Sequence, residues 1–177
     1  MSIEGICACL LRYFTAVVSI ALVLAVPTTA TADLITLKLP GITGDVTVEG
    51  QQGTSDVQEP VTGSAGGSRA RSLPVFSDLM IHKRLDRSSP ARFLALVKGS
   101  LLGSGVITFL RTDQGGFTTF FTITLTNVLL TKFQTGDSEN EVLAGREQIN
   151  LNYERIELKD EVTGQSACWN IPAATAC

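Results

Sequence analysis

The sequence predicts a mainly β protein: a small antiparallel β-barrel with one short α-helix packed on its side. Apolar residues make up 44% of the 177 residues and charged residues only 18%, which is typical of a globular rather than a disordered chain. Short runs rich in β-branched and aromatic residues are separated by turn signals, such as Pro40-Gly41. Only one stretch carries the punctuation of a helix. Many strands with a single short helix indicate a closed or nearly closed barrel.

The N-terminal segment, residues 1–32, is predicted to be a signal peptide. A single arginine precedes the apolar run at residues 13–26, which is shorter than the roughly 20 residues of a membrane span. Ala30 and Ala32 then place small side chains where signal peptidase requires them. We expect cleavage before Asp33 and a secreted or periplasmic protein, which touches the membrane only through this segment. An uncleaved N-terminal anchor is the alternative.

The mature domain is predicted to span residues 33–160, and its first strand lies within residues 33–48. Apolar and polar residues alternate in LITLKL before a Pro-Gly pair stops the strand. Residues 49–74 are rich in Gly, Ser, Gln and Thr, and we interpret them as a long flexible loop. Within that loop, only residues 55–57 could pair as a weak strand.

A strand over residues 75–83 is predicted next, followed by the helix. Ser89 suits the N-cap, Pro90 the first helical position, and Gly99 lies just past the end. Three apolar residues fall on one face of this helix and are expected to pack against the sheet. They are Phe93, Leu94 and Val97.

Strands follow the helix in close succession. We expect them at residues 104–113, 117–127, 128–136 and 147–160. The first two are joined through Gln114-Gly115-Gly116, which is a hairpin signal. In the last segment the apolar alternation slips by one residue, which indicates a β-bulge near Glu154-Arg155.

Two cysteines remain in the mature chain, Cys168 and Cys177, both in the C-terminal tail at residues 161–177. An exported protein meets conditions that permit disulfides. We therefore expect these two cysteines to form a bridge that constrains a loose tail, with two unrelated thiols as the alternative. Cys7 and Cys9 would be removed with the signal peptide.

The sequence offers little for catalysis or metal binding. His82 is the only histidine, and a surface or packed side chain is the favoured interpretation over a catalytic base. Asp137, Glu139 and Glu141 share a polar loop but lack the spacing of a calcium loop. We predict no enzyme activity and no cofactor. The net charge of −3, without a basic block, also argues against nucleic acid as a partner.

Four dispersed motifs resemble the Hcp family, the tube protein of type VI secretion systems. They are the LKLPGITG opening at residues 37–44, the strand and helix start at residues 78–90, the FQTG corner at residues 133–136, and INLNY at residues 149–153. The motifs occur in the family's order. The resemblance covers about residues 34–160.

This resemblance implies an Hcp-like barrel that forms hexameric rings, which stack into a tube and carry effectors. Implied partners are other copies of the chain and further type VI secretion components or effectors. An exported binding or adhesive module that acts without a tube is the alternative, because family members do not use a cleaved signal. The family also has a tryptophan-bearing strand where residues 49–74 lack any aromatic, so we expect weaker rings than is usual.

Overall fold

The computed structural model describes residues 33–46, 51–61, 76–113, 115–136 and 145–177. The predicted signal peptide, including Ala30 and Ala32, therefore lies outside the described residues. The same holds for the acidic residues Asp137, Glu139 and Glu141.

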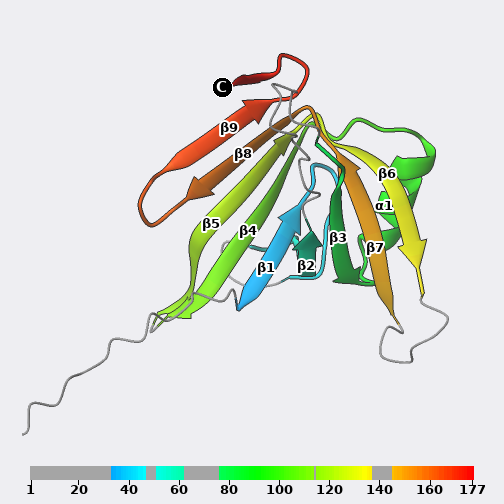
Figure 1. The fold of residues 1–177 in the computed structure, drawn as a ribbon. Coiled ribbons are helices and arrows are strands. Elements are labelled where there is room, and N and C mark those ends of the chain that lie inside the picture. Colours follow the sequence, from blue (N-terminus) through cyan, green and yellow to red (C-terminus); the bar gives the residue numbers. More distant parts are fainter. Residues whose placement is uncertain (1–32, 47–50, 62–75, 114, 137–144) are drawn as a thin grey trace, which may run out of the picture.

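The described residues form ten strands and one helix (Figure 1). The strands are β1 (Leu34–Lys38), β2 (Ser55–Val61), β3 (Leu79–Arg84), β4 (Ser104–Asp113), β5 (Gly116–Thr126), β6 (Leu129–Thr135), β7 (Arg146–Asn152), β8 (Arg155–Asp160), β9 (Ser166–Asn170) and β10 (Thr175–Ala176); the helix is α1 (Ser89–Val97). All strands join one sheet in the order β10-β9-β8-β5-β4-β1-β2-β3-β7-β6. The predicted mainly β architecture with one short helix is confirmed.

The sheet curls without closing. Its end strands are β10 and β6, and Figure 1 shows the strands meeting at one end of the molecule and spreading apart at the other. Two long segments make the curl. Residues 116–135 turn from β5 into β6 through Asn127, whose φ is 55°, and residues 146–160 turn from β7 into β8. The result is a partly open barrel around one core.

The predicted β-bulge near Glu154-Arg155 is a break between two strands. β7 ends at Asn152 and β8 begins at Arg155, so the chain leaves the partners β3 and β6 for the partners β5 and β9. Tyr153 and Ile156 are both buried on either side of the break. The slip in the apolar pattern therefore marks a corner of the sheet and not one extra residue.

The core lies inside the curl and draws on nearly every strand. Its most buried side chains alternate along their strands, as a half-buried sheet requires. They include Leu37, Leu79, Ile81, Ile107, Leu125, Ile149 and Leu151. The alternation noted in the sequence agrees with Leu37 in the first strand and with Ile149 and Leu151 in residues 147–160.

The interpretation of residues 49–74 as one flexible loop is wrong for residues 55–61. These residues form β2, which lies between β1 and β3 near the middle of the sheet. Ser55 and Val57 are buried there. β1 pairs with Ser55 and Asp56, and β3 pairs along β2 from Val57 to Val61. The strand therefore forms despite its weak intrinsic β preference. The remaining parts, residues 49–50 and 62–74, lie outside the described residues.

The segment at residues 161–177 continues the sheet and is not a loose tail. β9 pairs with β8, and β10 pairs with β9. Trp169 stacks near Phe76, with ring centroids 6.4 Å apart. The sequence contains few strand signals here, and pairing with β8 supplies the order that local propensity does not.

Gly44 is a point where the chain needs a glycine. A Cβ atom at this position would lie 2.2 Å from the backbone oxygen of Thr54, just before β2. We expect Gly44→Ala to lower the free energy of unfolding by about 1–3 kcal/mol, because an added methyl must push the backbone aside. Gly115→Ala is the matched control, since a Cβ there meets nothing within 4 Å. Equal urea midpoints for the two variants would contradict this prediction.

Candidate interaction surface

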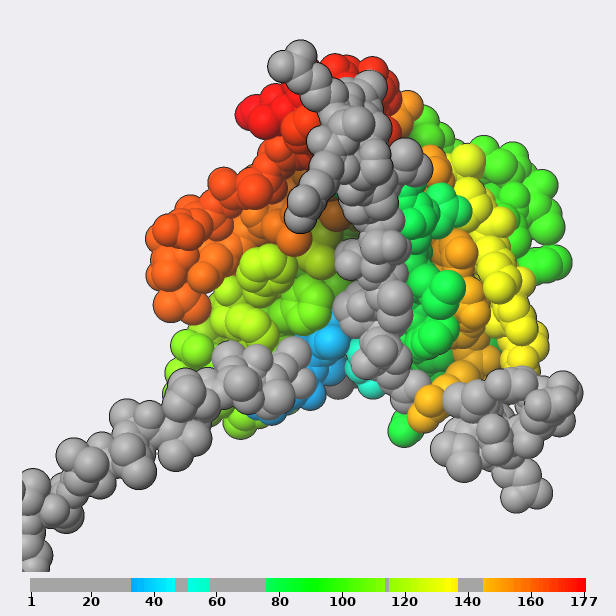
Figure 2. All heavy atoms as spheres, viewed as in Figure 1, coloured from blue at the N-terminus to red at the C-terminus, as the bar shows by residue number. Residues whose placement is uncertain are grey.

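The outer face of α1 is apolar and exposed. Phe93, Leu94 and Val97 are 52%, 48% and 60% exposed, and Leu101, just after the helix, is 64% exposed. The expectation that the first three pack against the sheet is therefore wrong for Leu94 and Val97, whereas the half-exposed Phe93 contacts Phe133 of β6. Figure 2 shows α1 standing out from the side of the molecule. The helix itself is where the sequence predicts it, although its N-cap is Ser88 and not Ser89.

The helix instead turns a mixed polar and apolar face toward the sheet, on which Ala91, Ala95 and Leu96 pack against the core. Its buried residues are Ser89, Arg92 and Ala95, and Arg92 is only 1% exposed. Periodicity places the apolar residues on one face correctly, but it cannot tell whether that face meets the chain's own sheet. A polar cluster beneath the helix decides the orientation.

An ion-pair cluster lies under the helix. Lys83 of β3 and Glu147 of β7 stand opposite each other in the sheet, and their Nζ and Oε1 atoms are 2.7 Å apart. The Arg92 Nη1 atom reaches the same Oε1 at 3.2 Å. Lys83 and Glu147 are 0% and 2% exposed. The helix is thus held to two neighbouring strands through one carboxylate.

Two serines and Asp86 extend the ion-pair cluster. Arg92 Nη2 donates to Ser55 Oγ at 2.7 Å, and Ser55 Oγ lies 3.1 Å from Ser88 Oγ. Lys83 Nζ is 3.2 Å from Asp86 Oδ1. Burial favours a raised pKa for Asp86, but hydrogen bonds from Ser88 and Ser55, together with the charge of Lys83, hold its pKa below the ordinary value.

The cluster balances two cations against two anions. Burial lowers the pKa of Arg92, and the charges of Asp86 and Glu147 oppose that shift. Among the described residues, two buried side-chain atoms lack a hydrogen-bond partner, Arg92 Nε and Glu147 Oε2. With its charges paired and enclosed, the cluster serves to orient α1, which leaves the apolar face outward.

The edge strand β6 adjoins this helix face. In the described part of the chain, β7 is the only strand that pairs with β6 along its length. Phe93 contacts Phe133 of β6 edge to face, with centroids 5.8 Å apart. We call Phe93, Leu94, Val97, Leu101 and the outer edge of β6 the α1–β6 surface. Exposed apolar groups beside an open strand edge are typical of a protein contact surface.

Asp33, the expected first residue of the mature chain, begins the described structure. Its backbone N–H donates to the Leu110 oxygen at 2.9 Å. Its carboxylate accepts from the Thr112 N–H. Hydrogen bonds from Thr112 lower the pKa of this carboxyl, although it is exposed. The predicted cleavage point therefore abuts the start of β1.

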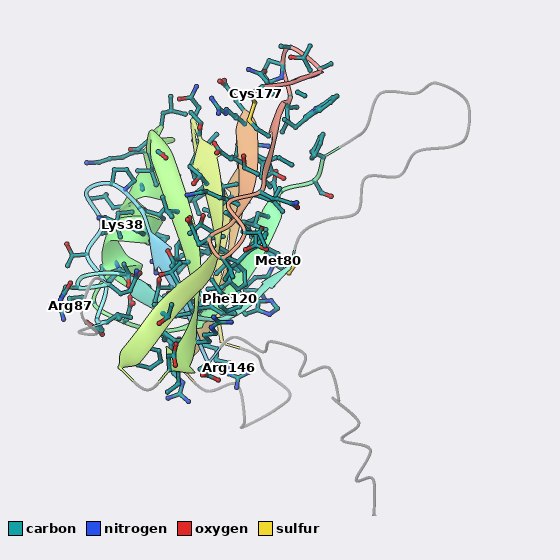
Figure 3. All side chains as sticks on the ribbon, turned by 90° about the vertical axis from the view of Figure 1, so that its left-hand side faces the viewer. Lys38, Met80, Arg87, Phe120, Arg146 and Cys177 are labelled. Carbon is teal, nitrogen blue, oxygen red and sulfur yellow. A yellow bond between two sulfur atoms is a disulfide. The ribbon has the colours of Figure 1, made fainter. Side chains whose placement is uncertain are left out.

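Cys168 and Cys177 are joined in the structure, with Cα atoms 5.3 Å apart. Figure 3 shows the sulfur–sulfur bond beside Cys177, far from the labelled Arg87. The Arg155 Nε–H points to the Cys168 sulfur at 2.9 Å. Sequence reasoning does not reveal this contact, because it depends on the pairing of β8, which begins at Arg155, with β9, where Cys168 lies 13 residues further along the chain.

The remaining candidates do not form a site in the described part of the chain. No group of three or more His, Cys, Asp or Glu side chains is placed there to hold a metal ion. His82 lies half-buried on β3. In the same residues, no helix is both long and apolar enough to span a membrane.

The family model for the type VI secretion system effector Hcp matches residues 36–159. The chain belongs to the Hcp family. The match starts within β1 and ends within β8, so β9 and β10 lie beyond it. It includes α1 and the three strands that hold the ion-pair cluster.

Solved Hcp structures share this fold. Hcp1 from Salmonella typhimurium superposes with a TM-score of 0.69 at 19% identity, over 81% of this chain and 99% of that one. A type VI secretion system effector from Yersinia pestis superposes with a TM-score of 0.65 at 17% identity, over 77% of this chain and 98% of that one. The secreted protein Hcp3 from Pseudomonas aeruginosa superposes with a TM-score of 0.62 at 19% identity, over 80% of this chain and 98% of that one. No curated protein matches the sequence.

Proposed function

We propose that the mature chain is a structural subunit of a type VI secretion tube. It forms hexameric rings, which stack and carry effectors. The observation that carries this proposal is the Hcp family match over residues 36–159, which runs from within β1 to within β8 of the sheet. The partners are further copies of the chain and components or effectors of the same secretion system.

The α1–β6 surface supports the assembly. A ring requires a heterologous interface, in which one patch of a subunit meets a different patch of the next. Phe93, Val97 and Leu101 offer apolar area that the isolated subunit leaves in water. We assign this surface to one side of the subunit contact.

β2 bears on the expectation of weak rings. Residues 55–61 form a strand between β1 and β3, so part of this segment is ordered within the sheet. Residues 49–74 still supply no aromatic side chain, so we keep the expectation of rings that are weaker than is usual for the family. We expect their stability to depend mainly on the α1–β6 surface.

Sedimentation of the exported protein over a wide concentration range tests the assembly. A species with six times the monomer mass, in equilibrium with monomer at low concentration, is the expected result. A protein that stays monomeric throughout would exclude the tube role and leave the alternative. That alternative is an exported Hcp-like binding or adhesive module, and the predicted signal peptide favours it.

Residues 1–32 predict the localisation of the protein. We expect cleavage between Ala32 and Asp33, and hence a secreted or periplasmic protein, because small side chains occupy the positions that signal peptidase tests. N-terminal sequencing of the exported protein should begin at Asp33. Ala32→Tyr should block processing, whereas Thr31→Tyr, at the untested position between, should not. Unprocessed chain in the membrane fraction of the parent protein would support an anchor instead.

A further inference from the structure

The C-terminal strand β10 is held to the sheet by little besides a covalent bond. Its two residues pair with Trp169 and Asn170 of β9, and both are exposed. One further backbone hydrogen bond runs from the Cys177 N–H to the Cys168 oxygen at 3.3 Å. Such a short, solvated strand has few contacts of its own to offset the entropy of ordering it.

The turn between β9 and β10 also has an unfavourable backbone conformation. Ala174 has a φ of 52°, in the left-handed region that a residue with a Cβ atom rarely adopts. Its N–H donates to the Ile171 oxygen at 3.1 Å. The Ala173 N–H also donates to Asn170 Oδ1 at 2.9 Å. These local bonds must offset the left-handed residue, so we expect the turn to open more readily when nothing ties its far end.

The two sulfurs of the disulfide differ in their surroundings. Cys177 is exposed, whereas Cys168 is partly buried. The Arg155 Nε–H lies 2.9 Å from the Cys168 sulfur, and Arg155 is itself oriented by Glu157, at 3.2 Å. A guanidinium at this distance stabilises negative charge on sulfur, so Cys168 is the better leaving group and Cys177 the more accessible target.

We propose that the Cys168–Cys177 disulfide is a thiol-reducible latch on β10. While it is oxidised, β10 covers the outer edge of β9. When it is reduced, the strained turn opens and the backbone groups of residues 168–170 become free. An uncovered strand edge is a template for pairing with another strand, so the redox state sets whether this edge of the sheet is available.

A dithiol reductant opens the latch in two steps. Its thiolate attacks Cys177 Sγ and forms a mixed disulfide, and the electron pair of the broken bond goes to Cys168 Sγ, as a thiolate beside Arg155. The second reductant thiolate then attacks the reductant sulfur of the mixed disulfide and releases Cys177 as a thiolate, which water protonates. The protein gains two electrons and the dithiol becomes a disulfide.

Hydrogen exchange of the exported protein, before and after dithiothreitol, tests the opening. We expect the amides of residues 168–177 to lose at least about tenfold in protection on reduction, while those of β4 and β5 do not change. Ala174→Gly, which relieves the turn, should keep more of that protection after reduction. Unchanged protection in the reduced parent protein, or free thiols in the exported protein as isolated, would overturn the proposal.

The direction of attack is tested separately. After brief exposure to limiting glutathione, quenching with acid and alkylation, mass spectrometry should find the glutathione adduct on Cys177 and the alkyl group on Cys168. Arg155→Gln should slow reduction by about threefold or more. Lys159→Gln is the control, because that lysine pairs with Glu161 and not with sulfur. An adduct on Cys168, or equal rates for both variants, would contradict the role of Arg155.

Discussion

Replacing Glu147 by glutamine is expected to lower the free energy of unfolding by about 3–5 kcal/mol. The Glu147 Oε1 atom accepts from both Lys83 Nζ and Arg92 Nη1, at 2.7 and 3.2 Å, in a fully buried setting. The neutral amide leaves two buried cations with only Asp86 to balance them. Urea denaturation followed by circular dichroism measures the loss.

A second variant separates charge balance from packing. Lys83→Met combined with Glu147→Leu removes one charge of each sign, so Arg92 and Asp86 remain as a neutral pair. This double variant should be more stable than Glu147→Gln. Glu161→Gln, which breaks the solvent-exposed pair with Lys159, is the control and should change the urea midpoint only slightly, because exposed ion pairs contribute little to stability. A similar small loss for Glu147→Gln would contradict a structural role for the ion-pair cluster.

Replacing both Phe93 and Val97 by serine is expected to weaken the ring by about 100-fold or more in subunit affinity. Burial of two such side chains contributes about 3 kcal/mol or more per interface, and 1.4 kcal/mol corresponds to a factor of ten. Both residues are at least half exposed in the isolated subunit, so the fold itself should lose little.

Sedimentation at matched concentrations, together with thermal unfolding, checks this result. The expected outcome is monomer under conditions in which the parent protein forms rings, at nearly unchanged stability. Val162→Ser is the control, because this residue is 62% exposed in the turn between β8 and β9. Rings of unchanged affinity in the double variant would remove the α1–β6 surface from the interface, whereas a parent protein without rings would dismiss the tube role itself.

The sequence predicts the local features well, because each has a local physical cause. The Pro90 start and the Gly99 end of α1 agree with the structure, as does the hairpin between β4 and β5. The sequence indicates only a weak strand at residues 55–57, because the full length of β2 depends on β1 and β3, which pair with it from elsewhere in the chain. The orientation of α1 could not be predicted for a similar reason, because it depends on the contact of Arg92 with Glu147, 55 residues away in the chain.

The ion-pair cluster leaves a trace in the sequence that could have been detected. Lys83 continues the buried alternation of Leu79 and Ile81, and Glu147 precedes that of Ile149 and Leu151. A charged residue in phase with buried apolar positions signals a buried ion pair. Which residues meet could not be predicted, because Lys83 and Glu147 are 64 positions apart.

The central position of β1 in the sheet has a consequence for the folding rate of this chain. β1 lies between β4 and β2, and its residue Thr36 pairs with Thr108, so the middle of the sheet waits until most of the chain has been synthesised. Sheets built from such distant partners fold in milliseconds to seconds, which is slow for a domain of this size. If a leader attached directly to β1 starts export early, the domain behind the leader is still unfolded, and an unfolded chain can pass through a secretion channel.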